Sequence, residues 1–305
     1  MTRKVLWGII VILLVTNATT LFFELKPNEQ VSPSQENQAK PVKEEDEREP
    51  VATIDGTEIT HQDWLTSLKE QHGEAVLEEL INKEIVLQLA EKNDIKIEKK
   101  LIERELSLME TMQTITDDKT IQTKREQWED QITYNYYLDE LITRDIKINE
   151  DTIKDYYDSY KEQFDFTETY QLSHIVVSSE AEANKITKEL KEGASFSVLA
   201  REYSNDESTK DKGGYLGYFS KESAYFPSEY YEHAQKLSSD AYSKPFKTNQ
   251  GYILIKVHRT LPGITFTYDE LKNQIKRQLA LDYVGDSYSP KVLWEELNVN
   301  WMYGD

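Results

Sequence analysis

The spacing of apolar residues changes twice along this chain, and these changes restrict its fold more than any other feature. Before about residue 165, apolar side chains recur every three or four positions, which is typical of amphipathic helices. From Tyr170 the segment YQLSHIVVS has the pattern of a strand. The helical spacing returns after Gly263. Helical segments therefore flank a mixed block at 168–260, which predicts an α+β fold.

The first helical part follows a short extended segment, VATIDGTEIT, with a turn at Asp55 and Gly56. Thr60 is suited to cap a helix, with Asp63 at the capping-box position. The next segment predicts a further helix, with an apolar stripe formed by Val76, Leu77, Leu80, Ile81, Ile85 and Leu89. More helices are expected over 98–113, 118–143 and 150–164. The last one starts at Asn149 and carries Tyr156, Tyr157 and Tyr160, for which core packing is the ordinary interpretation.

The mixed block predicts a compact unit with a strand at each end. After the first strand we expect helices over 180–193 and 195–204, a strand at 214–219, a helical turn at 228–237, and a hairpin of KPFKT and YILIKVH joined by NQG. The C-terminal stripes consist of Leu271, Ile275, Leu279, Val292, Leu293 and Leu297. These last helices are short and need the N-terminal helices to bury their stripes. Insertion of the block into one helical domain is therefore favoured over two separate helical domains.

Residues 1–25 have the character of a membrane segment. A basic start precedes an uncharged stretch from Val5 to Phe23, roughly long enough to cross ~30 Å of hydrocarbon. A cleaved signal peptide would use a site near Ala18, whereas the absence of a clear A-x-A motif favours an uncleaved anchor. Either interpretation leaves the body of the chain exported. Residues 26–50 are polar and rich in Pro, Gln and Glu, which predicts a disordered linker.

Composition excludes several classes of function. The net charge of -20 argues against a nucleic-acid partner, because phosphate binding needs a basic face. The chain has no cysteine, so it has neither disulfides nor a thiol nucleophile. No two of the five histidines have the spacing of a helical metal pair, and the acidic loop after residue 203 lacks the pattern of a calcium-binding loop. We therefore predict no metal and no cofactor.

Four motifs occur in order within the block: LSHIVV, SFSVLAREYSND, KGGYLGYF and PFKTNQGYILIKV. In this order and spacing, 168–260 resembles the parvulin family of peptidyl-prolyl cis-trans isomerases. The flanking segments resemble PrsA-type foldases and the SurA chaperone, in which helices like those of 261–305 complete an N-terminal chaperone domain like 51–167. The resemblance thus implies a helical chaperone domain with an inserted parvulin-like module.

The resemblance also implies a site. Its catalytic residues are His174, Asp206 and Thr248, and the apolar floor for the proline ring is Leu216, Phe226 and Tyr230. From position alone, the favoured interpretation of His174 is a half-buried strand histidine whose ring bonds to a neighbouring hydroxyl. Two departures from the family pattern stand out: Tyr215 replaces an acidic residue, and Ile253 replaces a second histidine. We expect His174 to bond to Thr248 and, without the second histidine, to have fewer polar partners.

The expected function is that of an extracytoplasmic peptidyl-prolyl isomerase and foldase that assists the folding of exported proteins. Its partners would be unfolded or proline-containing exported polypeptides, with the membrane contacted through the N-terminal helix. Self-association as a homodimer is left open. The alternative is a membrane-tethered chaperone that keeps the parvulin fold for binding only, with a degraded active site. A purely structural membrane protein would show neither behaviour.

Overall fold

The computed structural model describes residues 50–223, 227–285 and 288–304. The predicted membrane segment and all of the predicted linker except Pro50 lie outside these ranges, as does Phe226. Across the ranges that the structure describes, no helix is both long and apolar enough to cross a membrane. The chain forms two compact units that divide after Leu68.

The first unit contains a hairpin of β1 (Ala52–Ile54) and β2 (Thr57–Ile59), joined by the predicted turn. Gly56 has a φ of 83°, which a glycine adopts without strain. Helix α2 (His61–Lys92) follows, and Thr60 and Asp63 exchange the predicted capping bonds at its start. Two separate helices were expected here, but α2 is continuous.

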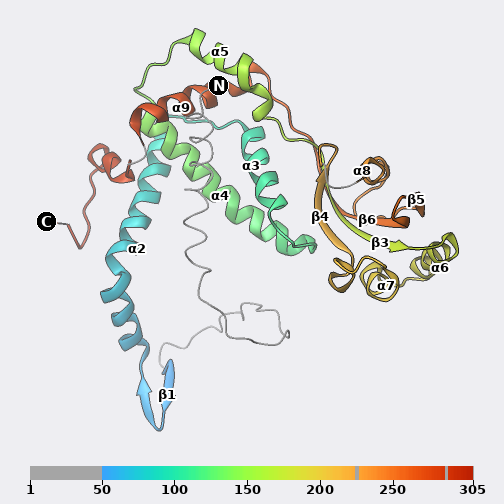
Figure 1. Ribbon diagram of the computed structural model, residues 1–305. Coiled ribbons are helices and arrows are strands. Elements are labelled where there is room, and N and C mark those ends of the chain that lie inside the picture. Colours follow the sequence, from blue (N-terminus) through green and yellow to red (C-terminus); the bar gives the residue numbers. More distant parts are fainter. Residues whose placement is uncertain (1–49, 224–226, 286–287, 305) are drawn as a thin grey trace. The chain divides into compact units, whose positions relative to one another are not determined.

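Gly73 lies within α2, in the part of the helix that belongs to the second unit. A Cβ on Gly73 would lie 2.7 Å from the hydroxyl of Tyr303, so the glycine leaves room for the C-terminal end of the chain. The remaining helices are α3 (Lys99–Thr111), α4 (Asp118–Thr143), α5 (Glu150–Tyr160) and α9 (Tyr268–Val284), with a 3-10 turn η1 at Lys161–Gln163 (Figure 1). Segment η3 (Pro290–Glu296), predicted as a helix, is a 3-10 helix.

Segments that precede the sheet in sequence and segments that follow it share the helical core. One cluster consists of Ile85, Val86, Leu89, Leu141 and Leu293, and another of Leu101, Ile153, Phe266, Leu271 and Ile275. Tyr156 and Tyr157 pack against the second cluster, and the Tyr157 hydroxyl donates to the carbonyl of Phe266. The C-terminal residues therefore pack against helices that precede the sheet in sequence. The tyrosine-rich face of α5 contributes to this packing.

Two predicted stripe assignments were wrong. Val76 and Leu80 are exposed on α2, whereas Val86 and Ala90, which were not part of the predicted stripe, are buried further along the helix. In η3, Val292 is exposed and its neighbour Leu293 is buried. An apolar pattern marks the face of a helix that can be buried, but the neighbouring elements decide how far along the helix that face is covered.

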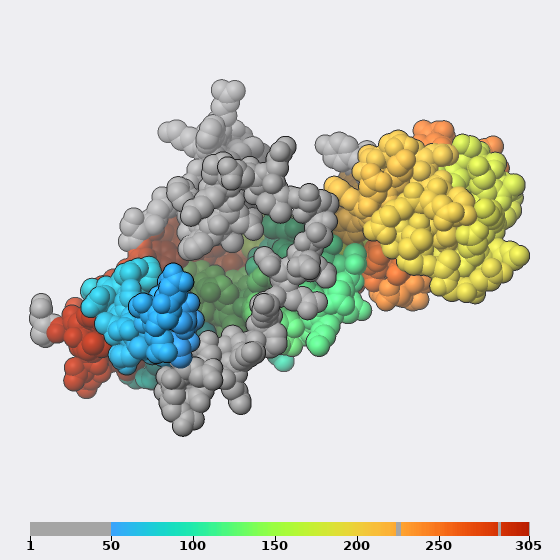
Figure 2. Space-filling model, turned by 90° about the horizontal axis from the view of Figure 1, so that it is seen from below, coloured from blue at the N-terminus to red at the C-terminus, as the bar shows by residue number. Residues whose placement is uncertain are grey.

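The mixed block forms a four-stranded antiparallel sheet in the order β4-β3-β6-β5. Its strands are β3 (Thr169–Val177), β4 (Tyr215–Ser220), β5 (Phe246–Thr248) and β6 (Gly251–Leu261). Its helices are α6 (Glu180–Lys191), α7 (Phe196–Tyr203) and α8 (Ser228–Ala234), with a 3-10 turn η2 at Lys210–Lys212. These segments form one contiguous body, coloured yellow to orange in Figure 2.

The two faces of the sheet are covered by different helices. Helices α6 and α7 pack on one face, against Ile175, Val177 and Leu254, and α8 packs on the other (Figure 1). Because side chains alternate along β3, His174 shares the α8 face with Leu172 and Val176, as the spacing predicted. This alternation turns the histidine ring toward α8.

Candidate functional site

His174 is held at both ring nitrogens. Its Nδ1 lies 2.7 Å from the hydroxyl of Tyr230, and its Nε2 lies 2.8 Å from Oδ2 of Asp206 and 3.1 Å from Oγ1 of Thr209. The expectation that Ile253 would leave the histidine with fewer polar partners was therefore wrong. Ile253 is fully buried in the core beside β3, and a tyrosine on α8 supplies the missing polar contact.

Asp206 lies in the loop after α7, and neighbouring side chains hold its carboxylate. Oδ1 accepts from the backbone N–H and the hydroxyl of Ser208, at 3.1 and 2.7 Å, and Oδ2 accepts from the hydroxyl of Thr209 at 2.5 Å. Burial alone would raise the pKa of Asp206, but the bonds from Thr209, Ser208 and His174 outweigh it and hold the pKa well below its usual range. Asp206 is thus a carboxylate at neutral pH.

The histidine is neutral at the same pH. Burial lowers the pKa of His174 below its usual value, although the neighbouring carboxylate of Asp206 acts in the opposite direction. An ionised carboxylate can only accept hydrogen bonds, so Nε2 of His174 carries the proton that is shared with Asp206. The pair is a neutral imidazole next to a fixed negative charge.

Backbone geometry brings the loop and β4 close to His174. Its N–H donates to the carbonyl of Gly214 at 2.8 Å, and a Cβ on Gly214 would lie 2.0 Å from the His174 carbonyl oxygen. With a φ of 77°, this position is suited to glycine. Two residues further along β3, the carbonyl of Val176 accepts from the N–H of Asn205 at 2.7 Å. The loop is thereby fastened to β3 on both sides of Asp206.

These residues border a pocket of about 420 Å³. It is lined by His174, Val176, Asn205, Asp206, Ser208, Thr209, Leu216 and Gln250. Leu216 and Val176 provide apolar surface, and the carboxylate of Asp206 provides the charge. A pocket with an apolar wall and one fixed charge is suited to a small ring attached to a polar backbone.

The structure brings three of the six predicted site residues to this pocket, namely His174, Asp206 and Leu216. Tyr230 is almost completely buried, so it supports His174 from behind instead of offering a surface to a ligand. The hydroxyl of Thr248 accepts from the N–H of Gln250 at 3.1 Å, and the partners of His174 lie elsewhere. The expected bond between His174 and Thr248 is therefore not formed.

Two residues that hold Asp206 were missed by the sequence analysis. Ser208 and Thr209 follow Asp206 at two and three positions, and side-chain oxygens at this spacing commonly satisfy an Asx or ST turn. The loop segment that begins with Asp-Glu-Ser-Thr carries this signal. Its first part belongs to the site.

Tyr215 does not line the pocket. Its hydroxyl donates to the carbonyl of Gln113 at 3.3 Å and accepts from the side-chain amide of Gln171 at 3.1 Å. Leu216, the next residue on β4, lines the pocket because successive side chains of a strand point to opposite faces. Replacement of an acidic residue by Tyr215 thus alters a contact with the segment after α3.

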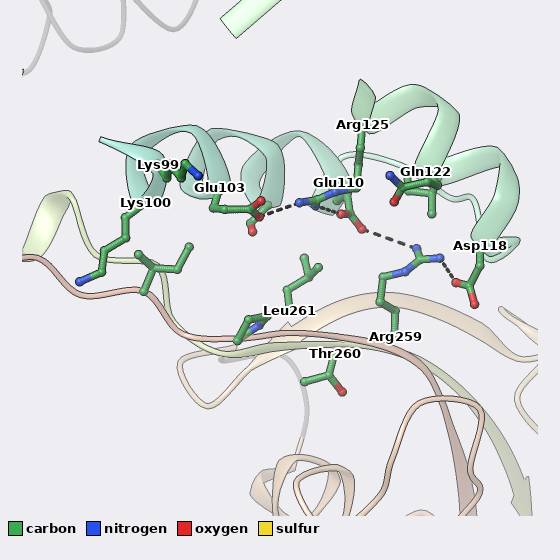
Figure 3. Close-up of a pocket in the computed structure, with 14 residues that line it drawn as sticks. Lys99, Lys100, Glu103, Glu110, Asp118, Gln122, Arg125, Arg259, Thr260 and Leu261 are labelled. Atoms are coloured by element: carbon green, nitrogen blue, oxygen red, sulfur yellow. Dashed lines mark hydrogen bonds and ion pairs between the residues drawn. The ribbon is translucent and has the colours of Figure 1, made fainter. Parts of the chain in front are cut away.

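A second cavity, of about 620 Å³, lies between α3, α4 and β6. Five of its charged side chains form an ion-pair network, which we call the Arg259 cluster: Glu103, Glu110, Asp118, Arg125 and Arg259 (Figure 3). Arg125 pairs with both glutamates, and Arg259 pairs with Glu110 and Asp118. None of the predicted site residues lies here. Within the described ranges, no group of three or more His, Asp or Glu side chains is placed to hold a metal ion.

Comparison with known proteins gives a consistent result. A model of the PPIC-type peptidyl-prolyl isomerase domain matches residues 148–273. The YacD protein of Bacillus subtilis, whose name assigns it to the peptidyl-prolyl cis-trans isomerases, is 41% identical over 258 residues, which cover 84% of this chain and 86% of that protein. Foldase protein PrsA 2 of Bacillus cereus is 31% identical over 248 residues, covering 81% of each.

A crystal structure of the peptidylprolyl isomerase PrsA from Bacillus cereus is 22% identical and covers 84% of this chain and 95% of that one, with a TM-score of 0.32. This TM-score is too low to support a conclusion about how the elements are arranged. The identity and the coverage of the first two relatives are sufficient. The chain belongs to the parvulin-type, or PPIC-type, peptidyl-prolyl cis-trans isomerases that include the PrsA foldases.

Proposed function

We propose that this protein is an extracytoplasmic peptidyl-prolyl cis-trans isomerase and foldase that acts on exported polypeptides. The observation that carries the proposal is the ionised carboxylate of Asp206, held by His174, Ser208 and Thr209 at a pocket whose apolar wall includes Leu216. Membership of the isomerase family supports the same conclusion.

The reaction needs no covalent bond to be made. The barrier to rotation about an X–Pro bond is roughly 18–20 kcal/mol, because twisting breaks the amide resonance. Resonance in the planar amide places partial negative charge on the carbonyl oxygen. A carboxylate near that oxygen raises the energy of the planar form relative to the twisted form, in which this charge is smaller. Such preferential binding of the transition state accelerates exchange.

Each residue has a defined part in this mechanism. Leu216 and Val176 hold the proline ring in apolar surroundings, which leaves the ring free to turn while the preceding residue is fixed by polar contacts. Asp206 supplies the field near the carbonyl. His174 donates from Nε2 to Asp206 and, with Thr209, keeps the carboxylate in one orientation. Preorganised charge of this kind needs little rearrangement during the reaction.

The test is an exchange measurement on a proline-containing peptide by NMR, with the chain from residue 50 onward. Asp206→Asn keeps the size of the side chain and removes its charge, and we expect a fall in kcat/KM of about tenfold or more, or ~1.4 kcal/mol per factor of ten. Asp211→Asn is the matched control, because it removes an exposed charge from the same loop. Exchange at the uncatalysed rate by the folded wild-type protein would refute the enzymatic function.

A second candidate function is that of a non-catalytic chaperone. The observation that favours it is the apolar surface of α2, where Val76 and Leu80 are exposed beside a cavity of about 440 Å³ that Tyr134 also lines. Unfolded chains offer complementary apolar side chains. If this function is separate from catalysis, Asp206→Asn should suppress aggregation of an unfolded protein as well as wild type does. Aggregation that proceeds equally with and without the protein would rule it out.

The domain organisation and location are also proposals. We infer a membrane anchor at 1–25, a linker at 26–50, a helical chaperone domain at 51–167 completed by 261–305, and the isomerase module at 168–260. The uncharged N-terminal stretch and the contacts of η3 and α9 with earlier helices support this division. Membrane fractionation of the full chain tests the anchor, and light scattering of the chain from residue 50 onward decides whether a homodimer forms.

A further inference from the structure

Three buried or partly buried side chains form a continuous line of hydrogen bonds behind the pocket. The hydroxyl of Tyr230 on α8 contacts Nδ1 of His174 at 2.7 Å, and Nε2 of the same ring contacts Asp206 at 2.8 Å. Tyr230 is 2% exposed and His174 is 3% exposed, so water does not readily replace either partner. His174 and Asp206 both line the pocket, and Asp206 is the member of the line that carries a charge.

The chemistry of the three groups sets the direction of both bonds. The carboxylate of Asp206 can only accept, so the proton of the neutral ring is on Nε2. Nδ1 is then a bare acceptor, and the phenol of Tyr230 must donate to it. Burial raises the pKa of Tyr230 well above its usual value, so the phenol keeps its proton. Thr209 donates to Asp206, so its oxygen faces Nε2 as a second acceptor.

The apolar surroundings of the His174 ring make the bond from Tyr230 to Nδ1 the contact that sets the tautomer of the ring. On its face of β3, His174 lies between Leu172 and Val176 and opposite Ile255 of β6, and none of these three side chains has a polar atom. Tyr230 is the partner that the described structure gives to Nδ1. Without the hydroxyl, Nδ1 would be a buried acceptor with no donor, at a cost of roughly 1–3 kcal/mol. Moving the proton to Nδ1, or adding a second proton, would then become easier.

We propose that Tyr230 is a positioning residue of the isomerase site: its hydroxyl fixes the tautomer and orientation of His174 and, through that ring, the orientation of the Asp206 carboxylate. This inference rests on the proposed isomerase function and extends it to a residue that does not touch the substrate. Tyr230 also gives His174 a polar partner that the aliphatic side chain of Ile253 cannot provide.

The test compares Tyr230→Phe with Tyr231→Phe in the chain from residue 50 onward. Tyr231 is the neighbouring residue on α8, and its hydroxyl contacts Glu168 at 3.3 Å, so the control removes the same atom away from His174. For Tyr230→Phe we expect kcat/KM to fall several-fold, by about tenfold at most for one neutral hydrogen bond. Tyr231→Phe should keep the wild-type value.

Two further measurements distinguish positioning from a general loss of packing. The phenol stabilises the neutral ring by donating to Nδ1, so its removal should raise the pKa of His174. The acid limb of the kcat/KM profile should therefore move to higher pH in Tyr230→Phe, and it should not move in Tyr231→Phe. Nitrogen-15 NMR of the His174 ring should show a protonated Nε2 in wild type and a mixed or reversed tautomer in Tyr230→Phe.

The outcomes separate this proposal from the proposed function. An unchanged tautomer and pH profile in Tyr230→Phe would overturn the positioning role even if the protein is an active isomerase. A changed tautomer in a protein without isomerase activity would keep the hydrogen-bond role and overturn the function. If Tyr230→Phe does not fold, the wild-type spectrum decides, because a proton on Nδ1 of His174 contradicts the proposal.

Discussion

At the scale of single residues, His258 behaves differently from His174. It lies on β6 beside the sheet face opposite α8, and its Nε2 is 2.8 Å from the hydroxyl of Ser173. Burial lowers the pKa of His258 to about 4, and the positive charges of Lys256 and Arg259 act in the same direction. Asp240 acts in the opposite direction but does not offset them. No nearby carboxylate is hydrogen-bonded to this ring in the described structure.

The lowered pKa of His258 in the folded chain predicts that the free energy of unfolding depends on pH. The unfolded chain binds a proton at His258 near pH 6.5, whereas the folded chain binds it near pH 4. Between these values the unfolded state holds more protons, so the free energy of unfolding should fall as the pH is lowered through this window. His258→Gln keeps a polar partner for Ser173 and does not titrate. Its urea unfolding between pH 7 and 4 should show a shallower slope, by up to one proton. Parallel slopes for the two proteins would exclude His258 as the source.

Residue-scale departures from a family pattern are poor guides to activity by themselves. By comparison with the family pattern, Ile253 removes a polar partner from His174 and Tyr215 replaces an acidic residue. The structure gives His174 the hydroxyl of Tyr230 instead, from a residue 56 positions away in sequence. It directs Tyr215 toward Gln113. Neither outcome follows from local spacing, because both depend on which elements the fold places next to the sheet.

At the scale of secondary-structure elements, the Arg259 cluster fastens β6 to α3 and α4 (Figure 3). Glu110 lies at its centre between two arginines and is 1% exposed, whereas the side chain of Glu103 at the edge is 57% exposed. The desolvated carboxylate depends on its partners, and the two guanidinium groups depend on it. An exposed pair contributes much less, because water and salt screen it.

Glu110→Gln and Glu103→Gln therefore form a matched pair. Glu110→Gln should reduce the free energy of unfolding by roughly 2–4 kcal/mol, because it leaves two partly buried arginines without their shared anion. Glu103→Gln should cost less than about 1 kcal/mol. Urea denaturation at low and high salt measures both. Equal losses for the two variants would mean that Glu110 is compensated by another anion.

At the scale of the whole molecule, helices that precede the sheet in sequence share a core with a segment that follows it. Leu293 in η3 packs with Ile85 and Leu89 of α2 and with Leu141 of α4. These contacts join residues far apart along the chain, so they form only when the segments before and after the sheet are both in place. Segment η3 is thus part of the helical core.

This arrangement predicts unequal effects at adjacent positions of η3. Leu293→Ala removes a side chain that is 3% exposed and should lower the free energy of unfolding by roughly 2–5 kcal/mol. Val292→Ala alters a side chain that is 60% exposed and should change stability by less than about 0.5 kcal/mol. Thermal and urea unfolding of both variants provide the measurement. A large effect at Val292 would show that its face is covered in solution.

The sequence by itself determined the features that depend on local chemistry. The helix and strand periods appear where they were expected. So do the capping residues Thr60 and Asn149 and the hairpin of β5 and β6. The order of the motifs indicated the family, and the alternation of β3 placed His174 on the correct face. These features follow from backbone geometry and from the spacing of neighbouring residues, which a sequence states directly.

Only the tertiary structure decided which groups meet. It assigned Tyr230 and Thr209 to His174, moved Thr248 out of that network, exposed Val76 and Leu80, and made α2 continuous through Gly73. A periodic pattern shows which face of an element is apolar, but not which element covers it. A hydrogen bond needs two groups within about 3 Å, and that distance is set by how the helices pack on the sheet.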